Sequence, residues 1–165
     1  MALGRYREDG VIGRSLLGEY IYRFKYGNDR KCGIILAELL HEKLVEIGID
    51  QEINMATIVP PTRVNKASPM RFILSRIDSD ILNEYRTDIL LRRKLTAQFK
   101  DMPDAEVKRQ AVKGVFSVNP EVDIEFKSIL VFDDIIDSGT TLNECSRILK
   151  EAGAGRVIVM TLATA

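Results

Sequence analysis

The chain has 165 residues, of which 45% are hydrophobic and 29% are charged, a composition typical of a single soluble globular domain. Lysine and arginine together number 24, as do aspartate and glutamate, so the charge balance argues against direct binding of nucleic acid. No apolar run approaches the ~18 residues of a membrane helix, and the N-terminus has no signal-peptide core, which predicts a cytoplasmic protein.

The first half of the chain predicts two helices and one strand. Residues 1–30 are rich in tyrosine and arginine and are expected to be irregular or partly helical. Residues 31–47 are predicted to form a helix that stops at Gly48, and residues 55–59 a buried strand. A second helix is expected over residues 71–83. The apolar stripes of these helices are Ile34, Ile35, Leu39, Leu40 and Leu44 in the first, and Ile73, Leu74, Ile77 and Ile81 in the second.

The second half predicts three strands, a short helix and a longer helix. A strand over residues 87–91 precedes a polar segment, residues 92–114, in which residues 104–112 are expected to form a short helix. The remaining predicted elements are a central strand over residues 128–132, a helix over 141–152 that ends at Gly153, and a final strand over 156–162. Alternating strands and helices indicate a parallel sheet, so the fold class is α/β, in one domain spanning residues 1–165.

The two cysteines and the single histidine indicate no metal site. Cys32 and Cys145 belong to no CxxC pair, so we expect two small buried thiols in a reducing compartment. His41 lies within a predicted helix, where a surface or packing role is expected.

The run ILVFDDIIDSGTT at residues 129–141 is the most informative pattern. A buried apolar strand leads into Asp133 and Asp134, and a polar turn around Gly139 then opens a helix. Free amides at a helix N-terminus bind phosphate, and carboxylates accept hydrogen bonds from hydroxyls. The two features together favour a phosphorylated sugar as ligand.

This run resembles the phosphoribosyl-diphosphate (PRPP) loop of the type I phosphoribosyltransferases. The segments YRFKYGNDR, LLRRKLTAQ and EVKRQAVKGVFSVNP are similar to the competence-protein-F (ComF) branch of that family, so most of the chain is covered. The resemblance implies a twisted, mainly parallel sheet flanked by helices, with a small hood built from residues 1–30. The cysteine cluster of a zinc finger, often found at the start of that branch, is absent from this sequence.

The resemblance also assigns the residues of the PRPP loop. Asp133 and Asp134 are expected to bind the ribose hydroxyls, directly or through a weakly or indirectly held metal ion. The 5-phosphate is expected at Asp137, Ser138, Gly139, Thr140 and Thr141. For Asp137 two roles stay open, a catalytic contact with the acceptor base and capping of the helix.

Two other interpretations of the acidic pair were considered. One aspartate would suffice to end a strand and cap a helix, so a purely structural role does not explain both. A Walker B strand also ends in acid, but it requires a partner GxxxxGK[ST] motif, which this sequence does not contain.

Two further segments are implied to bind pyrophosphate. In the family, the loop after the first core strand donates backbone amides, and a mobile loop closes over PRPP. The corresponding residues here are Pro61, Thr62, Arg63, Arg92, Arg93, Lys94 and Arg109. A solvated charged loop is the alternative for each cation. Residues 64–73 depart from the pattern of the ComF branch, because they lack its RGFNQ-like helix start.

The resemblance predicts a glycosyltransferase that uses PRPP and Mg²⁺, with a nitrogen nucleophile, such as a nucleobase, displacing pyrophosphate at ribose C1. Two alternatives stay open, a non-catalytic PRPP- or nucleotide-sensing module and a protein associated with competence or DNA uptake. Members of this family commonly form homodimers, so the resemblance implies a homodimer. Aromatic residues near the N-terminus are available to stack on an acceptor, although packing against the sheet is the preferred expectation; they are Tyr6, Tyr20, Tyr22, Phe24 and Tyr26.

Overall fold

The computed structural model describes residues 1–7, 13–49, 52–61, 68–94 and 105–165. The elements are, in chain order, β1 (Ala2–Arg5), α1 (Leu16–Gly27), α2 (Arg30–Glu46), β2 (Met55–Ile58), α3 (Pro69–Leu74), β3 (Leu90–Arg92), α4 (Ala105–Val112), β4 (Phe116–Val118), β5 (Ser128–Ile136), α5 (Thr140–Glu151) and β6 (Arg156–Thr164).

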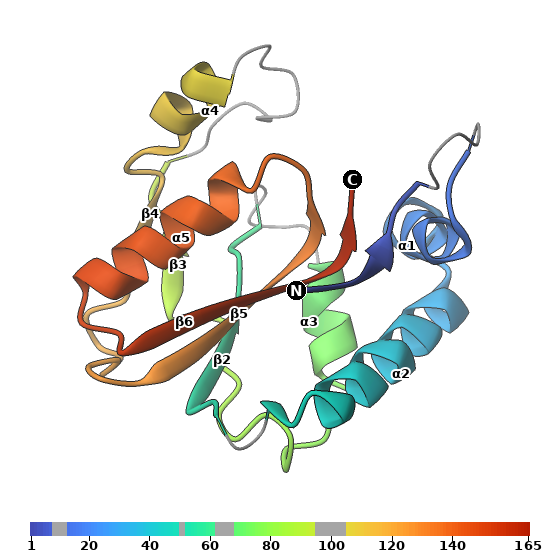
Figure 1. The fold of residues 1–165 in the computed structure, drawn as a ribbon, viewed down its shortest axis with the longest axis horizontal. Coiled ribbons are helices and arrows are strands. Elements are labelled where there is room, and N and C mark those ends of the chain that lie inside the picture. Colours follow the sequence, from blue (N-terminus) through green and yellow to red (C-terminus); the bar gives the residue numbers. More distant parts are fainter. Residues whose placement is uncertain (8–12, 50–51, 62–67, 95–104) are drawn as a thin grey trace.

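The main sheet has four strands in the order β1-β6-β5-β2, and all of its described pairings are parallel (Figure 1). β5 lies inside this sheet, between β6 and β2. β3 and β4 form a separate antiparallel ribbon, in which Leu90 pairs with Val118. The predicted α/β class with a mainly parallel sheet is confirmed.

Hydrophobic residues fill both faces of the main sheet. Leu130 and Phe132 of β5 point to one core, which includes buried residues of α1, α2 and α3. Ile129 and Val131 point to the opposite core, which includes buried residues of α5 and the β3-β4 ribbon. Figure 1 shows α1, α2 and α3 on one side of the sheet and α5 with the ribbon on the other. Burial on both faces explains the unbroken apolar run of β5.

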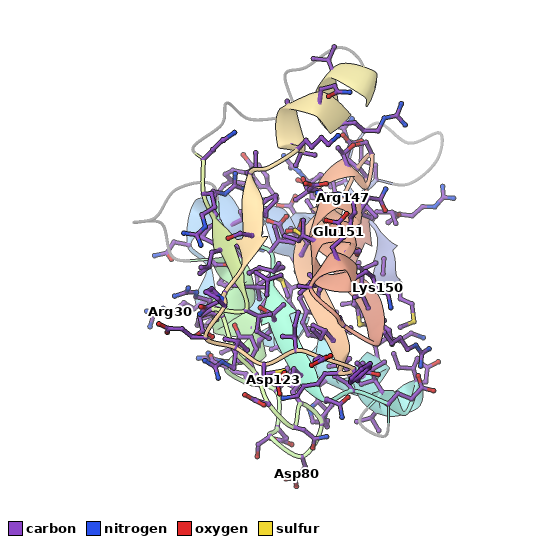
Figure 2. The ribbon with its side chains drawn as sticks, turned by 90° about the vertical axis from the view of Figure 1, so that its left-hand side faces the viewer. Arg30, Asp80, Asp123, Arg147, Lys150 and Glu151 are labelled. Carbon is purple, nitrogen blue, oxygen red and sulfur yellow. The ribbon has the colours of Figure 1, made fainter. Side chains whose placement is uncertain are left out.

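Charged side chains cover the outer face of α5. Arg147, Lys150 and Glu151 are exposed (Figure 2). Leu142 and Leu149 of the same helix are buried. The Lys150 ammonium donates hydrogen bonds to the carbonyls of Ala154 (2.8 Å) and Gly155 (2.7 Å), just after the C-terminus of the helix. A cation at this end also interacts favourably with the helix dipole.

Several predicted elements agree with the structure to within two residues. These are α2, β2, α4, α5 and β6, and Gly48 and Gly153 adopt positive φ where the chain leaves α2 and α5. The stripe predicted for α2 is partly wrong, because Ile34 and Leu39 are exposed. The buried face of that helix instead includes Gly33, Leu36, Ala37, Leu40 and Leu44.

The prediction for residues 71–83 is wrong in length. α3 ends at Leu74, and the Asp78 carbonyl then accepts turn hydrogen bonds from the amides of Ile81 and Leu82. Ile77 is nevertheless buried, and Ile81 packs against the core from non-helical backbone. The predicted strand over residues 87–91 begins later, at Leu90, and lies outside the main sheet.

The N-terminal segment is more ordered than predicted. β1 pairs with β6, and Ser15 caps α1 by accepting a hydrogen bond from the Gly18 amide (2.9 Å). A Cβ atom at Gly18 would lie 2.0 Å from the Tyr6 carbonyl oxygen, so glycine allows α1 to approach the chain that leaves β1. α1 is thereby held beside the sheet.

Candidate functional site

Several of the predicted site residues lie at the edge of the sheet where β2 ends beside β5. Ile58 of β2 pairs with Phe132 of β5, and the Val59 amide donates a hydrogen bond to the Phe132 carbonyl (2.9 Å). Because the strands are parallel, Pro60, which follows β2, and Asp133 of β5 lie at the same edge of the sheet. This is the edge at which open α/β sheets bind ligands.

The two aspartates lie inside β5, which corrects the prediction that the strand ends before them. β5 continues to Ile136, and Asp133 pairs with Thr161 of β6. Each carboxylate accepts a hydrogen bond from the next backbone amide: Asp133 Oδ1 from Asp134 N (2.8 Å), and Asp134 Oδ1 from Ile135 N (2.8 Å). Both side chains are half-buried and locally oriented.

Asp134 also pairs with a residue that the sequence analysis did not select. Lys25, in the last turn of α1, donates a hydrogen bond from Nζ to Asp134 Oδ2. Burial alone would lower the pKa of Lys25, but Asp134 and, more weakly, Asp133 raise it above its usual value. These residues are 109 positions apart, so no local spacing could have revealed the pair.

A turn centred on Gly139 opens α5. Gly139 has a φ of 70°, which glycine adopts without steric cost, and it precedes the helix without any side-chain cap. The side-chain oxygens of Ser138 and Thr140 are 2.9 Å apart. Asp137 and Ser138 are exposed, and Thr141 is half-buried. The uncapped first turn therefore offers amides and hydroxyls to an anion.

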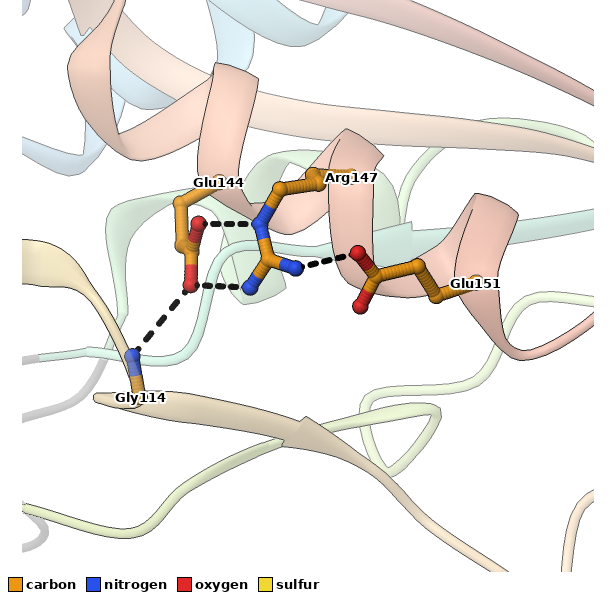
Figure 3. Close-up of polar contacts among 4 residues, drawn as sticks. All are labelled: Gly114, Glu144, Arg147 and Glu151. Carbon is orange, nitrogen blue, oxygen red and sulfur yellow. Dashed lines mark hydrogen bonds and ion pairs between the residues drawn. The ribbon is translucent and has the colours of Figure 1, made fainter.

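α5 is also anchored to the chain that precedes β4 (Figure 3). The buried Glu144 carboxylate accepts two hydrogen bonds from Arg147, both 2.8 Å, and one from the Gly114 amide at 3.3 Å. Arg147 in turn donates to Glu151 at 2.5 Å. Arg147 lowers the pKa of Glu144, although burial opposes this shift. The network connects α5 to the end of the predicted mobile loop.

Arg92 reaches the same sheet edge from the end of β3. Its Nη2 donates a hydrogen bond to the Pro60 carbonyl (3.3 Å), and its guanidinium lies 4.7 Å from the centre of the Phe116 ring. Its Nε and Nη1 atoms are buried without a hydrogen-bond partner among the described residues. Burial lowers the pKa of Arg92, against the attraction of nearby Asp133. The group stays charged, because arginine does not deprotonate in proteins.

The structure does not bring the other predicted pyrophosphate-binding residues together with Arg92 by any contact described for them. Arg93 and Lys94 are exposed, and Arg93 donates to the Ser117 hydroxyl (2.6 Å). Arg109 is exposed on α4, and Pro61 is half-buried after β2. Thr62, Arg63 and residues 64–67 of the atypical segment lie outside the described residues. So do residues 95–104 of the predicted closing segment, which spans residues 92–114.

The N-terminal aromatic residues divide into two groups. Tyr6, Tyr20 and Phe24 pack against the core, as preferred, and the Phe24 ring centre lies 5.0 Å from that of Phe72. Tyr22 and Tyr26 are exposed on α1, with ring centres 5.1 Å apart. Of these five residues, Tyr22 and Tyr26 are the exposed ones, whereas the other three are half-buried.

The cysteines follow the prediction. Cys32 and Cys145 are buried free thiols, and burial raises the pKa of both. Within the part of the chain that the structure describes, no three His, Cys, Asp or Glu side chains are grouped to hold a metal ion. Among the same residues, no helix has the length and apolarity required to cross a bilayer.

Comparison with known proteins agrees with this geometry. The model of the phosphoribosyl transferase domain family matches residues 36–165. The chain is 27% identical over 169 residues to competence protein F of Haemophilus influenzae, covering 94% of this chain and 72% of that protein, which confirms the predicted branch.

Two solved structures are also similar. Glutamine PRPP amidotransferase from B. subtilis is 25% identical, with a TM-score of 0.47, over 93% of this chain and 32% of that one. A hypoxanthine phosphoribosyl transferase from Trypanosoma cruzi is 13% identical, with a TM-score of 0.44, over 96% of this chain and 72% of that one. The family match, which spans most of the chain, is what decides the assignment: the chain belongs to the type I phosphoribosyltransferases, in their ComF-like branch.

Proposed function

We propose that the chain binds PRPP and transfers its phosphoribosyl group to a nitrogen nucleophile, releasing pyrophosphate. One observation carries the proposal. A single sheet edge brings together the paired acids Asp133 and Asp134, the uncapped start of α5, and the incompletely bonded guanidinium of Arg92. These groups match the diol, the 5-phosphate and the pyrophosphate of one ligand.

The residues have distinct roles in this proposal. Asp133 and Asp134 accept hydrogen bonds from the ribose hydroxyls. The amides and hydroxyls of Ser138, Gly139, Thr140 and Thr141 bind the 5-phosphate. Arg92 binds pyrophosphate, with Arg93, Lys94 and Arg109 as additional cations. Because arginine is permanently charged, it stabilises the growing negative charge on the leaving group.

Bound Mg²⁺ would offset the charge of pyrophosphate and act as a Lewis acid. Asp133 and Asp134 are the residues that would hold it, and the remaining ligands would have to be oxygens of PRPP. Two carboxylates fit the preference of Mg²⁺ for sites completed by substrate phosphates. Asp134 is already paired with Lys25, which favours weak or indirect coordination.

The reaction breaks the bond between ribose C1 and the pyrophosphate oxygen and forms a bond between C1 and the nucleophile. The electron pair of the broken bond leaves with pyrophosphate. The reaction proceeds through a transition state in which the ribose has oxocarbenium character. The nucleophile loses its proton as the new bond forms. Asp137 is our candidate for accepting that proton, because it is exposed and lies in the sequence between the two acids and the phosphate turn.

A non-catalytic PRPP- or nucleotide-sensing module is the second candidate function. The departure of residues 64–73 from the ComF pattern favours it, because that segment would otherwise help to build the pyrophosphate and acceptor contacts. The similarity to competence protein F suggests a further role in competence or DNA uptake, through a protein partner and not through contact with DNA.

We also propose that the protein is a homodimer and is located in the cytoplasm, where PRPP is available.

Release of pyrophosphate separates the two candidates. Purified protein is incubated with PRPP and Mg²⁺ and with a panel of nucleobases and small amines, and pyrophosphate is measured by a coupled assay. Catalysis predicts release that depends on one acceptor class and is lost in Arg92→Met. Binding of PRPP without release from any acceptor would instead support the sensing module.

A further inference from the structure

The ribose site receives a residue from outside the matched domain. The family model begins at residue 36, whereas Lys25 belongs to α1 and contacts Asp134. Both side chains are only 20% exposed, so the pair is largely withdrawn from water. An ion pair of this kind is screened less by salt than one on the open surface.

The pair fixes both oxygens of the Asp134 carboxylate. Oδ1 accepts the Ile135 amide hydrogen at 2.8 Å, and Oδ2 accepts from Lys25. Each oxygen of an ionised carboxylate has about two acceptor positions, so each retains one. The carboxylate is held in one orientation and can still accept hydrogen bonds from a vicinal diol.

Lys25 lies in the last turn of α1, and packing and capping hold this turn in place. The ring of its neighbour Phe24 packs on Phe72, and a Cβ atom at Gly33 of α2 would lie 2.6 Å from the Phe24 ring. Asn28 ends α1 in the left-handed conformation, and Asp29 immediately caps α2. Close packing and two adjacent caps therefore fix the last turn of α1, from which the ammonium extends to Asp134.

We propose that Lys25 is a positioning residue of the ribose site, which orients and neutralises Asp134 so that the sugar of a polyanionic ligand can dock there. This inference rests on the proposed function. Without the ammonium, two neighbouring carboxylates would face a ligand that itself carries several negative charges. The repulsion between these carboxylates and the negative charges of the ligand would oppose binding. In this proposal, α1 contributes Lys25 to the ribose site in addition to packing against the sheet.

The test compares four proteins by titration calorimetry with PRPP and Mg²⁺. Lys25→Met is expected to bind about tenfold more weakly than wild type, because one charged partner of Asp134 is lost. Lys25→Arg, which keeps the charge and a donor, is expected to recover most of the affinity. Lys31→Met makes the same chemical change at an exposed position of α2 and is expected to bind like wild type. Thermal unfolding checks that each variant is folded.

A double variant shows whether Lys25 acts through Asp134. If it does, Lys25→Met weakens binding much less in an Asp134→Asn background than in wild type. Wild-type affinity or tighter binding in Lys25→Met would overturn the inference, since the ammonium would then only cover Asp134 until the ligand arrives. Failure of wild type itself to bind PRPP would remove the proposed function, and this inference with it.

Discussion

Arg92 is the residue whose surroundings are best explained by a ligand. A buried donor that lacks a partner costs roughly 1–3 kcal/mol, and Nε and Nη1 of Arg92 both lack one among the described residues. Among the described residues, Arg92 contacts the Pro60 carbonyl and the Phe116 ring and is attracted by Asp133. A folded protein keeps such a group where binding or catalysis requires it.

Replacing Arg92 should therefore separate stability from binding. We expect Arg92→Met to change the free energy of unfolding by less than about 1 kcal/mol, because a buried cation with few partners contributes little net stability. The same change should weaken PRPP binding about tenfold or more. Denaturant unfolding and calorimetry measure the two effects, with Arg30→Met, at an exposed position at the start of α2, as the control. A large loss of stability with unchanged affinity would show that Arg92 is structural.

The sequence predicts local site residues better than distant ones. Gly139 and the two aspartates lie within a seven-residue stretch, so their chemistry and spacing could be read directly. Lys25 could not be selected, because only the seating of α1 beside the sheet brings it to Asp134. Arg92 was selected among several cations, but its buried unpaired nitrogens became evident only in the structure.

The start of α5 depends on the backbone conformation of Gly139. A Cβ atom there would meet only ordinary contacts, 3.5 Å from Ile136, so a substitution is penalised by the φ of 70° and not by crowding. We expect Gly139→Ala to cost about 1 kcal/mol of stability and to weaken PRPP binding as well.

Gly48→Ala is the matched control for this prediction. Gly48 follows α2 and has a φ of 60°, and a Cβ atom added there would have open space around it. Thermal unfolding should show a similar loss for both variants, while calorimetry should show weaker PRPP binding only for Gly139→Ala. Equal affinities would mean that the turn does not contact the phosphate.

The Glu144 network connects α5 to β4, and its stabilising effect should depend on pH. Folding lowers the pKa of Glu144, so the unfolded chain binds this proton more readily. The stabilisation is then complete above the ordinary glutamate pKa of about 4.3 and is lost as pH falls through the lower folded value.

We expect Glu144→Gln to lose about 1–3 kcal/mol at neutral pH, since it weakens hydrogen bonds to a charged group. Its stability should also fall less steeply than that of wild type below about pH 5. Denaturant unfolding across that range measures both slopes, and Glu121→Gln, at an exposed position, is the control. Parallel curves for Glu144→Gln and wild type would argue against a lowered pKa.

Periodicity predicts elements well where one face is clearly apolar and less well elsewhere. α5 was found because buried and charged positions alternate regularly along it. α3 was predicted too long, because Ile77 and Ile81 continue the helical spacing although turns position them. β1 was missed, because its residues ALGR carry no strand pattern and pair only through the backbone of β6.

At the scale of the whole molecule, the parallel sheet accounts for the position of the site. Two hydrophobic cores bury both faces of β5 and leave its carboxyl end as the place where polar side chains gather. The α/β class could be predicted, because alternating elements allow few topologies. The separate β3-β4 ribbon could not, because its pairing joins residues about 25 positions apart across a polar segment.

The most direct test of the account is calorimetric titration of PRPP, with Mg²⁺ present, into wild type and into Asp133→Asn/Asp134→Asn. We predict submillimolar binding by wild type and at least about tenfold weaker binding by the double variant, because amides replace the acceptor-only carboxylates. Asp78→Asn/Asp80→Asn makes the same change at exposed positions and should bind like wild type. No binding by wild type, or equal binding by Asp133→Asn/Asp134→Asn, would contradict a ribose phosphate site at the end of β5.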